Sequence, residues 1–167
     1  MWLGLSGRFR ARWSTRIHDE WKRNLLMNRP DLTAEQLDRT SDLMDRAIPG
    51  ALVTGFEPLM AGLSLPDPND HHVLATAIRC HASVIVTFNE RDFPADVLDA
   101  FGMEAQHPDV FTENLFDLDP ACVVSAAQRQ RQQLKSPPLE VDHYLEILRR
   151  QGLSQTVKAL SAFRGVL

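Results

Sequence analysis

The sequence predicts an α/β fold in which a parallel sheet is flanked by helices and followed by an all-helical C-terminal extension. Segments typical of strands alternate with helical patterns as far as about residue 106, which is the order of βαβ units. The segment 82–87 is rich in β-branched apolar residues, as in a central parallel strand that is covered on both faces. After Pro108 only helical patterns remain. We therefore expect one domain at residues 1–111 and a helical extension at residues 112–167.

An amphipathic helix is predicted near the N-terminus. Ser14 is a suitable N-cap for a helix that runs to about Asn28. Within this helix, Ile17, Trp21 and Leu25 recur every four residues and form one apolar stripe. We expect the stripe to face the core, with Trp21 packed inside it.

A second helix, a short strand and a helical turn follow. Thr33 and Gln36 have the spacing of a capping box, and the helix that they begin extends to about Ala47. Residues 51–54 have the composition of a short strand. Residues 58–62 begin with a proline and favour a helical turn.

The middle of the chain contains the alternation of helices and strands. A buried helix is predicted over residues 70–80 because its apolar side chains follow helical spacing. The strand at residues 82–87 comes next, followed by a helix at 93–102 with a proline in its first turn. Residues 103–106 form a further short strand in this interpretation. The apolar side chains of the buried helix are Val73, Leu74, Ala77 and Ile78.

Three helices are predicted in the C-terminal extension. Asp119-Pro120 begins the first, which runs to about Leu134 and ends at Ser136-Pro137-Pro138. Residues 139–150 form the second helix, and residues 153–163 form the third.

The composition excludes several classes of protein. With 44% hydrophobic residues, the 167-residue chain can bury a core without disulfides or a structural metal. Its two cysteines, Cys80 and Cys122, form no CxxC motif, which argues against a secreted disulfide scaffold or a cysteine zinc site. No run approaches the ~20 apolar residues that span a bilayer, and the opening apolar segment is too short for a signal peptide. We therefore expect a cytoplasmic protein without a membrane partner.

Charge is distributed unevenly along the chain. Residues 1–29 contain seven Arg and Lys against two Asp and Glu, although the whole chain has a net charge of −4. A basic N-terminal segment of this kind binds a polyanion or an acidic partner, or it is simply a solvated helix face. The charge pattern alone leaves both interpretations open.

Acidic residues collect where a helix is predicted to begin and where a strand is predicted to end. Asp67 and Asp70 precede the buried helix, while Asn89, Glu90 and Asp92 follow the strand that ends at Thr87. Ligands of open α/β sheets bind at the carboxyl ends of the strands. Clustered carboxylates repel one another unless a cation neutralises them, and Mg²⁺ and Mn²⁺ prefer such oxygen ligands. The cluster therefore points to metal-assisted phosphoester chemistry.

These polar residues also have structural interpretations. Asp67, Asp70 and Asp92 are each suitable helix caps, and that role requires no metal. The histidines of the central segment could bind a transition metal, but adjacent histidines on a helix point in different directions, so we expect a solvated face. Those histidines are His71, His72 and His81.

Two motifs in the central segment resemble those of the PIN-domain nucleases. They are LPDPNDHHVLATA at residues 65–77 and VIVTFNERDFP at residues 84–94. This family, which includes the ribonuclease toxins of VapBC-type toxin–antitoxin pairs, combines an Asp that opens an alanine-rich helix with a Thr-x-(Asp or Asn) that ends the next strand. Asp70 and Asn89 occupy those positions, and Glu20 falls on a third acidic position in an early helix. The resemblance covers about residues 14–111.

The resemblance implies an endoribonuclease that depends on Mg²⁺ or Mn²⁺ and hydrolyses RNA phosphodiester bonds. It implies Glu20 and Asp70 as the principal metal ligands, with Asp67 and Asp92 binding directly or through water. It further implies a cognate antitoxin protein as partner and a homodimer. Two more residues would orient a water molecule or a phosphate oxygen: Thr87 and Asn89.

Two departures from the family pattern carry expectations of their own. Asn89 stands where many relatives have an Asp, and a neutral amide is a weaker metal ligand. The apolar first strand of the family, with the Asp at its end, has no counterpart before Ser14. We therefore expect this chain to be poorly active or inactive. The alternative function is a catalytically inactive, truncated PIN-like module that binds an antitoxin or RNA without cleavage.

Overall fold

The computed structural model describes residues 2–134 and 138–167, which form two compact units. The N-terminal unit comprises residues 10–85 and 89–105. The C-terminal unit comprises residues 2–9, 86–88, 106–134 and 138–167. The predicted helix break at Ser136-Pro137 lies outside the described residues, and the predicted domain boundary between residues 111 and 112 stays a prediction.

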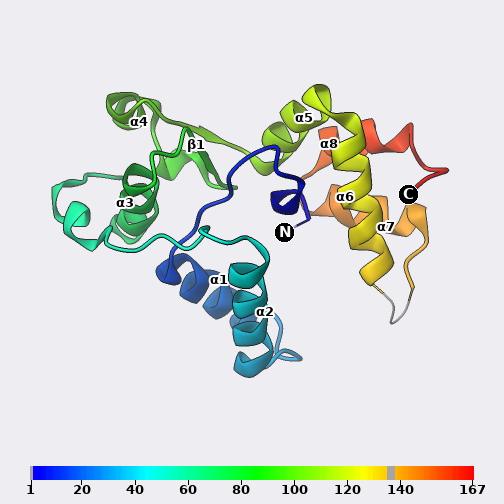
Figure 1. Cartoon of the computed structure of the whole chain (residues 1–167), viewed down its shortest axis with the longest axis horizontal. Coiled ribbons are helices and arrows are strands. Elements are labelled where there is room, and N and C mark those ends of the chain that lie inside the picture. The colour runs from blue at the N-terminus through cyan, green and yellow to red at the C-terminus, as the bar shows by residue number, and fades with distance from the viewer. Residues whose placement is uncertain (1, 135–137) are drawn as a thin grey trace. The chain divides into compact units, whose positions relative to one another are not determined.

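Two helices at the start of the N-terminal unit lie side by side, as Figure 1 shows. Helix α1 (Thr15–Asn28) is capped by the Ser14 hydroxyl, which accepts a hydrogen bond from the Ile17 amide. Helix α2 (Ala34–Ala47) begins at Thr33 with the predicted capping box. Both predicted helices are therefore confirmed. In each, the cap residue accepts a hydrogen bond from a backbone amide that the first turn leaves unpaired.

The buried face of α1 differs from the predicted apolar stripe. Leu25 is exposed and Trp21 is only half-buried, so the stripe of Ile17, Trp21 and Leu25 does not form the core contact. The buried residue of α1 is His18, with 4% of its surface exposed. The prediction fails because a polar network, rather than an apolar seam, joins α1 to its surroundings.

That network centres on His18. The Trp21 indole N–H donates to His18 Nδ1 over 2.9 Å, and His18 Nε2 lies 3.1 Å from Asp45 Oδ1 on α2. The indole of the buried Trp13 donates to the same Asp45 oxygen over 2.6 Å. Because Nδ1 accepts the Trp21 hydrogen bond, the His18 proton belongs on Nε2, facing Asp45.

The predicted strand at residues 51–54 is reduced to a single parallel bridge between Trp13 and Leu52. The Trp13 amide donates to the Ala51 carbonyl, and the Val53 amide donates to the Trp13 carbonyl. Ala51 and Val53 are buried whereas their neighbours are exposed, so the segment is extended but too short for a ladder. The predicted turn at residues 58–62 appears as a 3₁₀ segment, Glu57–Gly62.

The remaining elements up to residue 106 follow the predicted order. Leu74 and Ala77 of the central helix pack against Ile85 and Leu98 in one apolar core. Gly102 ends the last helical turn with φ +64°, a left-handed conformation that favours glycine. The elements are α3 (His71–Arg79), β1 (Val84–Val86), α4 (Ala95–Leu98) with the 3₁₀ turn Asp99–Phe101, and β2 (Glu104–Gln106).

Strands β1 and β2 form a small parallel sheet of two strands among the described residues. The Glu104 amide donates to the Ser83 carbonyl, and the Thr87 amide donates to the Gln106 carbonyl. The predicted α/β class is therefore confirmed. The expectation that β1 is a central strand covered on both faces is wrong, because Val86 is 45% exposed.

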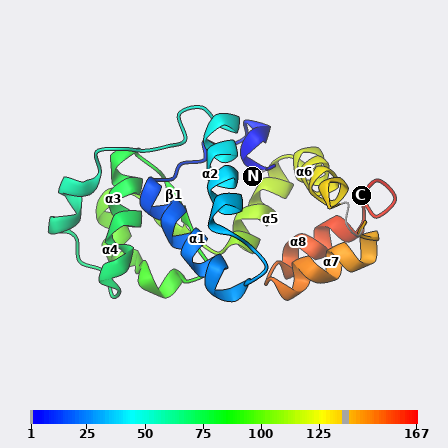
Figure 2. The same ribbon diagram turned by 90° about the horizontal axis from the view of Figure 1, so that it is seen from below.

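The C-terminal unit is a helical assembly, drawn from a second direction in Figure 2. Helix α5 packs on α6 and α8, and α7 packs on α8. Tyr144, Leu160 and Val157 lie at the centre of its apolar core, each at most 2% exposed. The predicted extension missed α5, whose signal is Pro108 at its first position. The helices are α5 (Pro108–Leu118), α6 (Pro120–Gln133), α7 (Val141–Arg150) and α8 (Ser154–Ser161).

A buried carboxylate on α5 caps α8. Asp109 Oδ1 accepts hydrogen bonds from the Thr156 amide and hydroxyl, and its Oδ2 accepts one from the Gln155 amide, all over 2.8 Å. Burial raises the pKa of Asp109, but these hydrogen bonds together lower it below its ordinary value. One side chain from α5 therefore serves as the N-terminal cap of a helix 46 residues away in sequence.

None of the helices in the described parts of the chain is long and apolar enough to cross a membrane.

Candidate metal centre

Three aspartates of the N-terminal unit come together at the start of α3. One carboxylate oxygen from each of Asp67, Asp70 and Asp92 lies within 4.8 Å of the other two. All three side chains are half-buried. This spacing suits a divalent cation, which takes hard oxygen ligands from several carboxylates at once.

Local backbone structure places two of the three aspartates. Asp67 precedes the 3₁₀ turn Pro68–Asp70, and its Oδ1 accepts the Asn69 amide over 2.8 Å. Proline in the first turn fixes the direction of the chain, and Asp70 ends that turn where α3 begins at His71. Both carboxylates are thereby brought to the same end of α3.

The third aspartate arrives from the loop after β1. Asp92 ends the 3₁₀ turn Glu90–Asp92, whose N-cap is Asn89. The side-chain amide of Asn89 donates a hydrogen bond to Asp92 Oδ2. Asn89 therefore orients an acidic group of the cluster.

The capping interpretation applies to one of the three aspartates. Asp67 does cap the 3₁₀ turn that follows it. Within the described residues the Asp70 side chain makes no capping hydrogen bond to α3, and Pro94 rather than Asp92 is the N-cap of α4. Capping thus leaves the positions of Asp70 and Asp92 unexplained.

Electrostatics mark Asp70 as the centre of the cluster. Burial, followed by the negative charges of Asp92, Asp67 and Glu20, raises the pKa of Asp70 to about 6. The negative charges around Asp70 repel its carboxylate at neutral pH. A bound cation would relieve that repulsion. Nearby acids that raise the pKa of one another are typical of functional sites.

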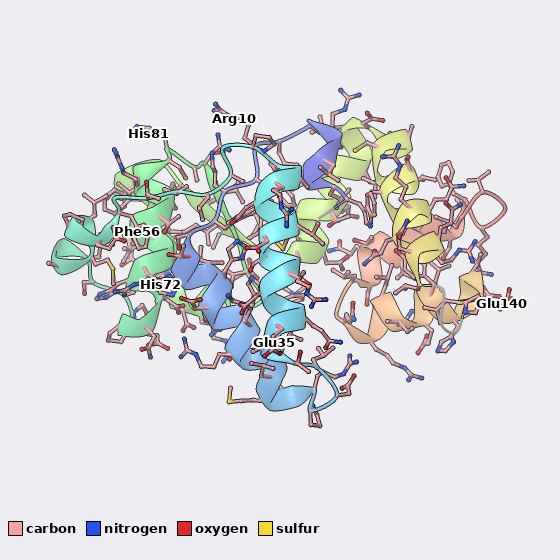
Figure 3. The ribbon with its side chains drawn as sticks, turned by 60° about the horizontal axis from the view of Figure 1, so that its bottom comes forward. Arg10, Glu35, Phe56, His72, His81 and Glu140 are labelled. Atoms are coloured by element: carbon pink, nitrogen blue, oxygen red, sulfur yellow. The ribbon has the colours of Figure 1, made fainter. Side chains whose placement is uncertain are left out.

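Glu20 lies beside this cluster and has a partner of its own. It is not one of the three grouped carboxylates, but its charge acts on Asp70. Glu20 Oε2 lies 3.4 Å from Nε2 of His72, a buried residue on α3 that Figure 3 labels. Burial lowers the pKa of His72 despite the opposing effect of Glu20, so the imidazole is neutral at pH 7.

The other two residues singled out by sequence lie just after β1. Thr87 is half-buried and belongs to the C-terminal unit, whereas Asn89 is exposed and belongs to the N-terminal unit. Asn89 contacts the three aspartates through Asp92. The predicted roles of both residues with water or phosphate stay predictions.

The histidines correct one expectation from the sequence. His81 is exposed, but His72 is buried and His71 is half-buried, so they do not form a solvated face. Ala75 and Thr76, three and four residues after His72 on the same face of the helix, are buried as well. His72 is thus a site residue that the motif-based reading missed.

Comparison with known families assigns most of the chain. The PIN domain family matches residues 1–91, a range that contains Glu20, Asp67 and Asp70 and stops just before Asp92. The family described as the VapC50 C-terminal domain matches residues 108–162.

One relative also matches part of the chain. The Mycobacterium tuberculosis (strain ATCC 25618 / H37Rv) protein named "Putative ribonuclease VapC50" is 41% identical over 68 residues. The matched segment spans 41% of this chain and 40% of that relative. No solved structure matches the chain. Because the PIN domain match spans more than half of the 167 residues, the chain belongs to the PIN-domain family.

Proposed function

We propose that the protein is a metal-dependent endoribonuclease that hydrolyses RNA phosphodiester bonds and acts as the toxin of a toxin–antitoxin pair. The observation that carries the proposal is the cluster of Asp67, Asp70 and Asp92, whose central carboxylate makes no cap among the described residues. Membership of the PIN-domain family and the name of the matching relative support a ribonuclease.

In this proposal the three aspartates hold Mg²⁺ or Mn²⁺, and Glu20 supplies a fourth carboxylate. A cation held by these carboxylates would activate a water molecule for attack on the phosphorus and would stabilise the leaving oxygen. Asn89 keeps Asp92 oriented, and with Thr87 it orients a water molecule or a phosphate oxygen. Since carboxylate oxygens are hard donors, the cluster fits these ions better than it fits softer metals.

The charges around the acidic groups support RNA as the substrate. Arg16 and Arg23 are exposed on α1, and both act electrostatically on His72. Positive side chains beside a metal site can hold the phosphates that flank the scissile bond. An antitoxin partner, a homodimer and a cytoplasmic location belong to the same proposal through the family.

The test compares the unaltered protein with Asp70→Asn in two assays. Calorimetric titration with Mn²⁺ should show binding that Asp70→Asn weakens at least tenfold, because the central ligand loses its charge. Cleavage of single-stranded RNA should require Mg²⁺ or Mn²⁺ and disappear with a chelator. Asp96→Asn, an exposed aspartate of the same unit, is the matched control.

The outcomes separate the candidate functions. Equal Mn²⁺ affinity in the unaltered protein and in Asp70→Asn would reject the metal site. Metal binding together with RNA binding but without cleavage would identify the inactive module instead. Cleavage that Asp70→Asn abolishes would also refute the expectation that this chain is poorly active.

A further inference from the structure

His72 combines burial, an acidic neighbour and an unused nitrogen. Its side chain is only 10% exposed, and Nε2 lies 3.4 Å from Glu20 Oε2. The other ring nitrogen, Nδ1, is buried and has no hydrogen-bond partner within the described residues. With the proton on Nε2, the ring donates to the Glu20 carboxylate. With the proton on Nδ1, the lone pair of Nε2 would face that carboxylate instead. The geometry therefore selects the tautomer that donates to Glu20.

This arrangement is unfavourable for the stability of the protein. A buried polar atom without a partner destabilises the folded protein, and an apolar side chain of similar size would avoid that cost. Most buried polar groups in proteins have partners, so an exception calls for a reason other than packing. Among the described residues, the polar contact of the His72 ring is with Glu20, and that contact supplies the reason.

We propose that His72 is a positioning residue, which holds the Glu20 carboxylate beside the cluster of Asp67, Asp70 and Asp92. The inference rests on the proposed function, since it concerns a ligand of that same site. The Glu20 side chain is 42% exposed, and a free glutamate side chain loses rotamer entropy when it is fixed. A rigid buried donor limits that freedom before the cation binds.

Two arginines near Glu20 on α1 are alternatives to His72 as its partner. Arg16 and Arg23 lie four residues before and three residues after Glu20 on α1, the spacings at which helical side chains pair. The described contact of the Glu20 carboxylate is instead with Nε2 of His72. The buried imidazole orients the carboxylate through Nε2, and its fixed ring keeps that contact in one geometry.

Three substitutions of His72 separate its hydrogen bond from its packing. His72→Gln places an amide nitrogen near the position of Nε2 and keeps the donor. His72→Asn places the amide near Nδ1, too far back to reach Glu20. His72→Leu fills the space without any donor. His81→Gln is the control, because His81 is exposed on the same unit and follows the other end of α3.

Three measurements test the role of His72. They are Mn²⁺ affinity by calorimetry, the melting temperature without metal, and RNA cleavage in Mn²⁺. We expect His72→Leu and His72→Asn to weaken Mn²⁺ binding about tenfold. His72→Gln should stay within about threefold of the unaltered protein, since its donor is retained. The melting temperature of His72→Leu should be unchanged or higher, which a purely structural histidine would not give.

A double-mutant cycle ties the effect to Glu20. In a Glu20→Gln background, His72→Leu should cause no further loss of Mn²⁺ affinity. Additive losses would overturn the inference, as would unaltered affinity in His72→Leu. Should His72→Leu not fold, equal affinities of His72→Gln and His72→Asn would overturn it instead. Absence of Mn²⁺ binding by the unaltered protein would reject the proposed function and this inference together.

Discussion

At the scale of single residues, the carboxylates grouped around Asp70 repel one another and so oppose folding until they are neutralised. Asp70 bears the effect most clearly, because burial and the charges of Asp92 and Asp67 raise its pKa to about 6. An aspartate whose folded pKa exceeds its ordinary value of about 3.9 destabilises the folded protein at neutral pH. The Asp70 carboxylate, which the proposed function needs most, therefore lowers the stability of the folded protein at neutral pH.

This conflict predicts the behaviour of Asp70→Asn without metal. The neutral amide removes repulsion on the order of 1 kcal/mol after solvent screening, so the melting temperature at pH 7 should rise by about 2–4 °C. Added Mn²⁺ should raise the melting temperature of the unaltered protein but not that of Asp70→Asn. Differential scanning calorimetry with and without Mn²⁺ checks both expectations. A lower melting temperature for metal-free Asp70→Asn would show that the carboxylate is stabilising.

At the scale of elements, the capping of α8 by Asp109 is the most specific tie in the C-terminal unit. Asp109→Ala should lower the free energy of unfolding by about 2 kcal/mol, because three donors on Gln155 and Thr156 lose their acceptor inside the protein. Urea denaturation at pH 7 measures the change. Asp142→Ala is the matched control, since Asp142 is exposed on α7 and should change stability by less than about 0.5 kcal/mol.

The same cap predicts a dependence of stability on pH. Because hydrogen bonds lower the pKa of Asp109, its contribution is present above the unfolded pKa of about 3.9 and is lost as the pH falls through the folded pKa. The difference in unfolding free energy between the unaltered protein and Asp109→Ala should therefore shrink below about pH 4. Denaturation curves at pH 7, 5 and 3 test this. A constant difference across that range would show that the charge of Asp109 is unimportant.

Sequence reasoning succeeds for elements whose signals are local. The capping box at Thr33 and the proline turn before α3 act within a few residues, so both elements were predictable from spacing. The motif likewise indicated Asp67 and Asp70 as neighbours. Burial of His18 and His72 was not predictable, because each depends on a contact with a different helix. The capping role of Asp109 was not predictable for the same reason, because its partners lie 46 and 47 residues away in the chain.

At the scale of the whole molecule, acidic groups have different surroundings in the two units. In the C-terminal unit, Asp142 pairs with Arg164, and Glu146 pairs with Arg149 and Arg150. Across residues 2–134 and 138–167, a metal-sized group of three carboxylates occurs only at Asp67, Asp70 and Asp92. We infer that the helices after α5 contribute no catalytic residue.

Substitutions in the C-terminal unit test that inference. Asp142→Ala and Glu146→Ala should each retain RNA cleavage within about twofold of the unaltered protein, because they break only exposed ion pairs. Initial rates of cleavage at saturating Mn²⁺ provide the measurement, and circular dichroism confirms that each variant is folded. Abolished cleavage in a folded variant would place part of the chemistry in this unit.

The hydrogen-bond network around His18 also gives the protein a built-in optical reporter. The chain has three tryptophans, and Trp13 and Trp21 both belong to that network in the N-terminal unit. The third, Trp2, belongs to the C-terminal unit. With Trp2 replaced by Phe, all indole fluorescence would originate from the unit that carries Asp70. Emission could then follow the opening of that unit alone, while far-ultraviolet circular dichroism follows the helices of both.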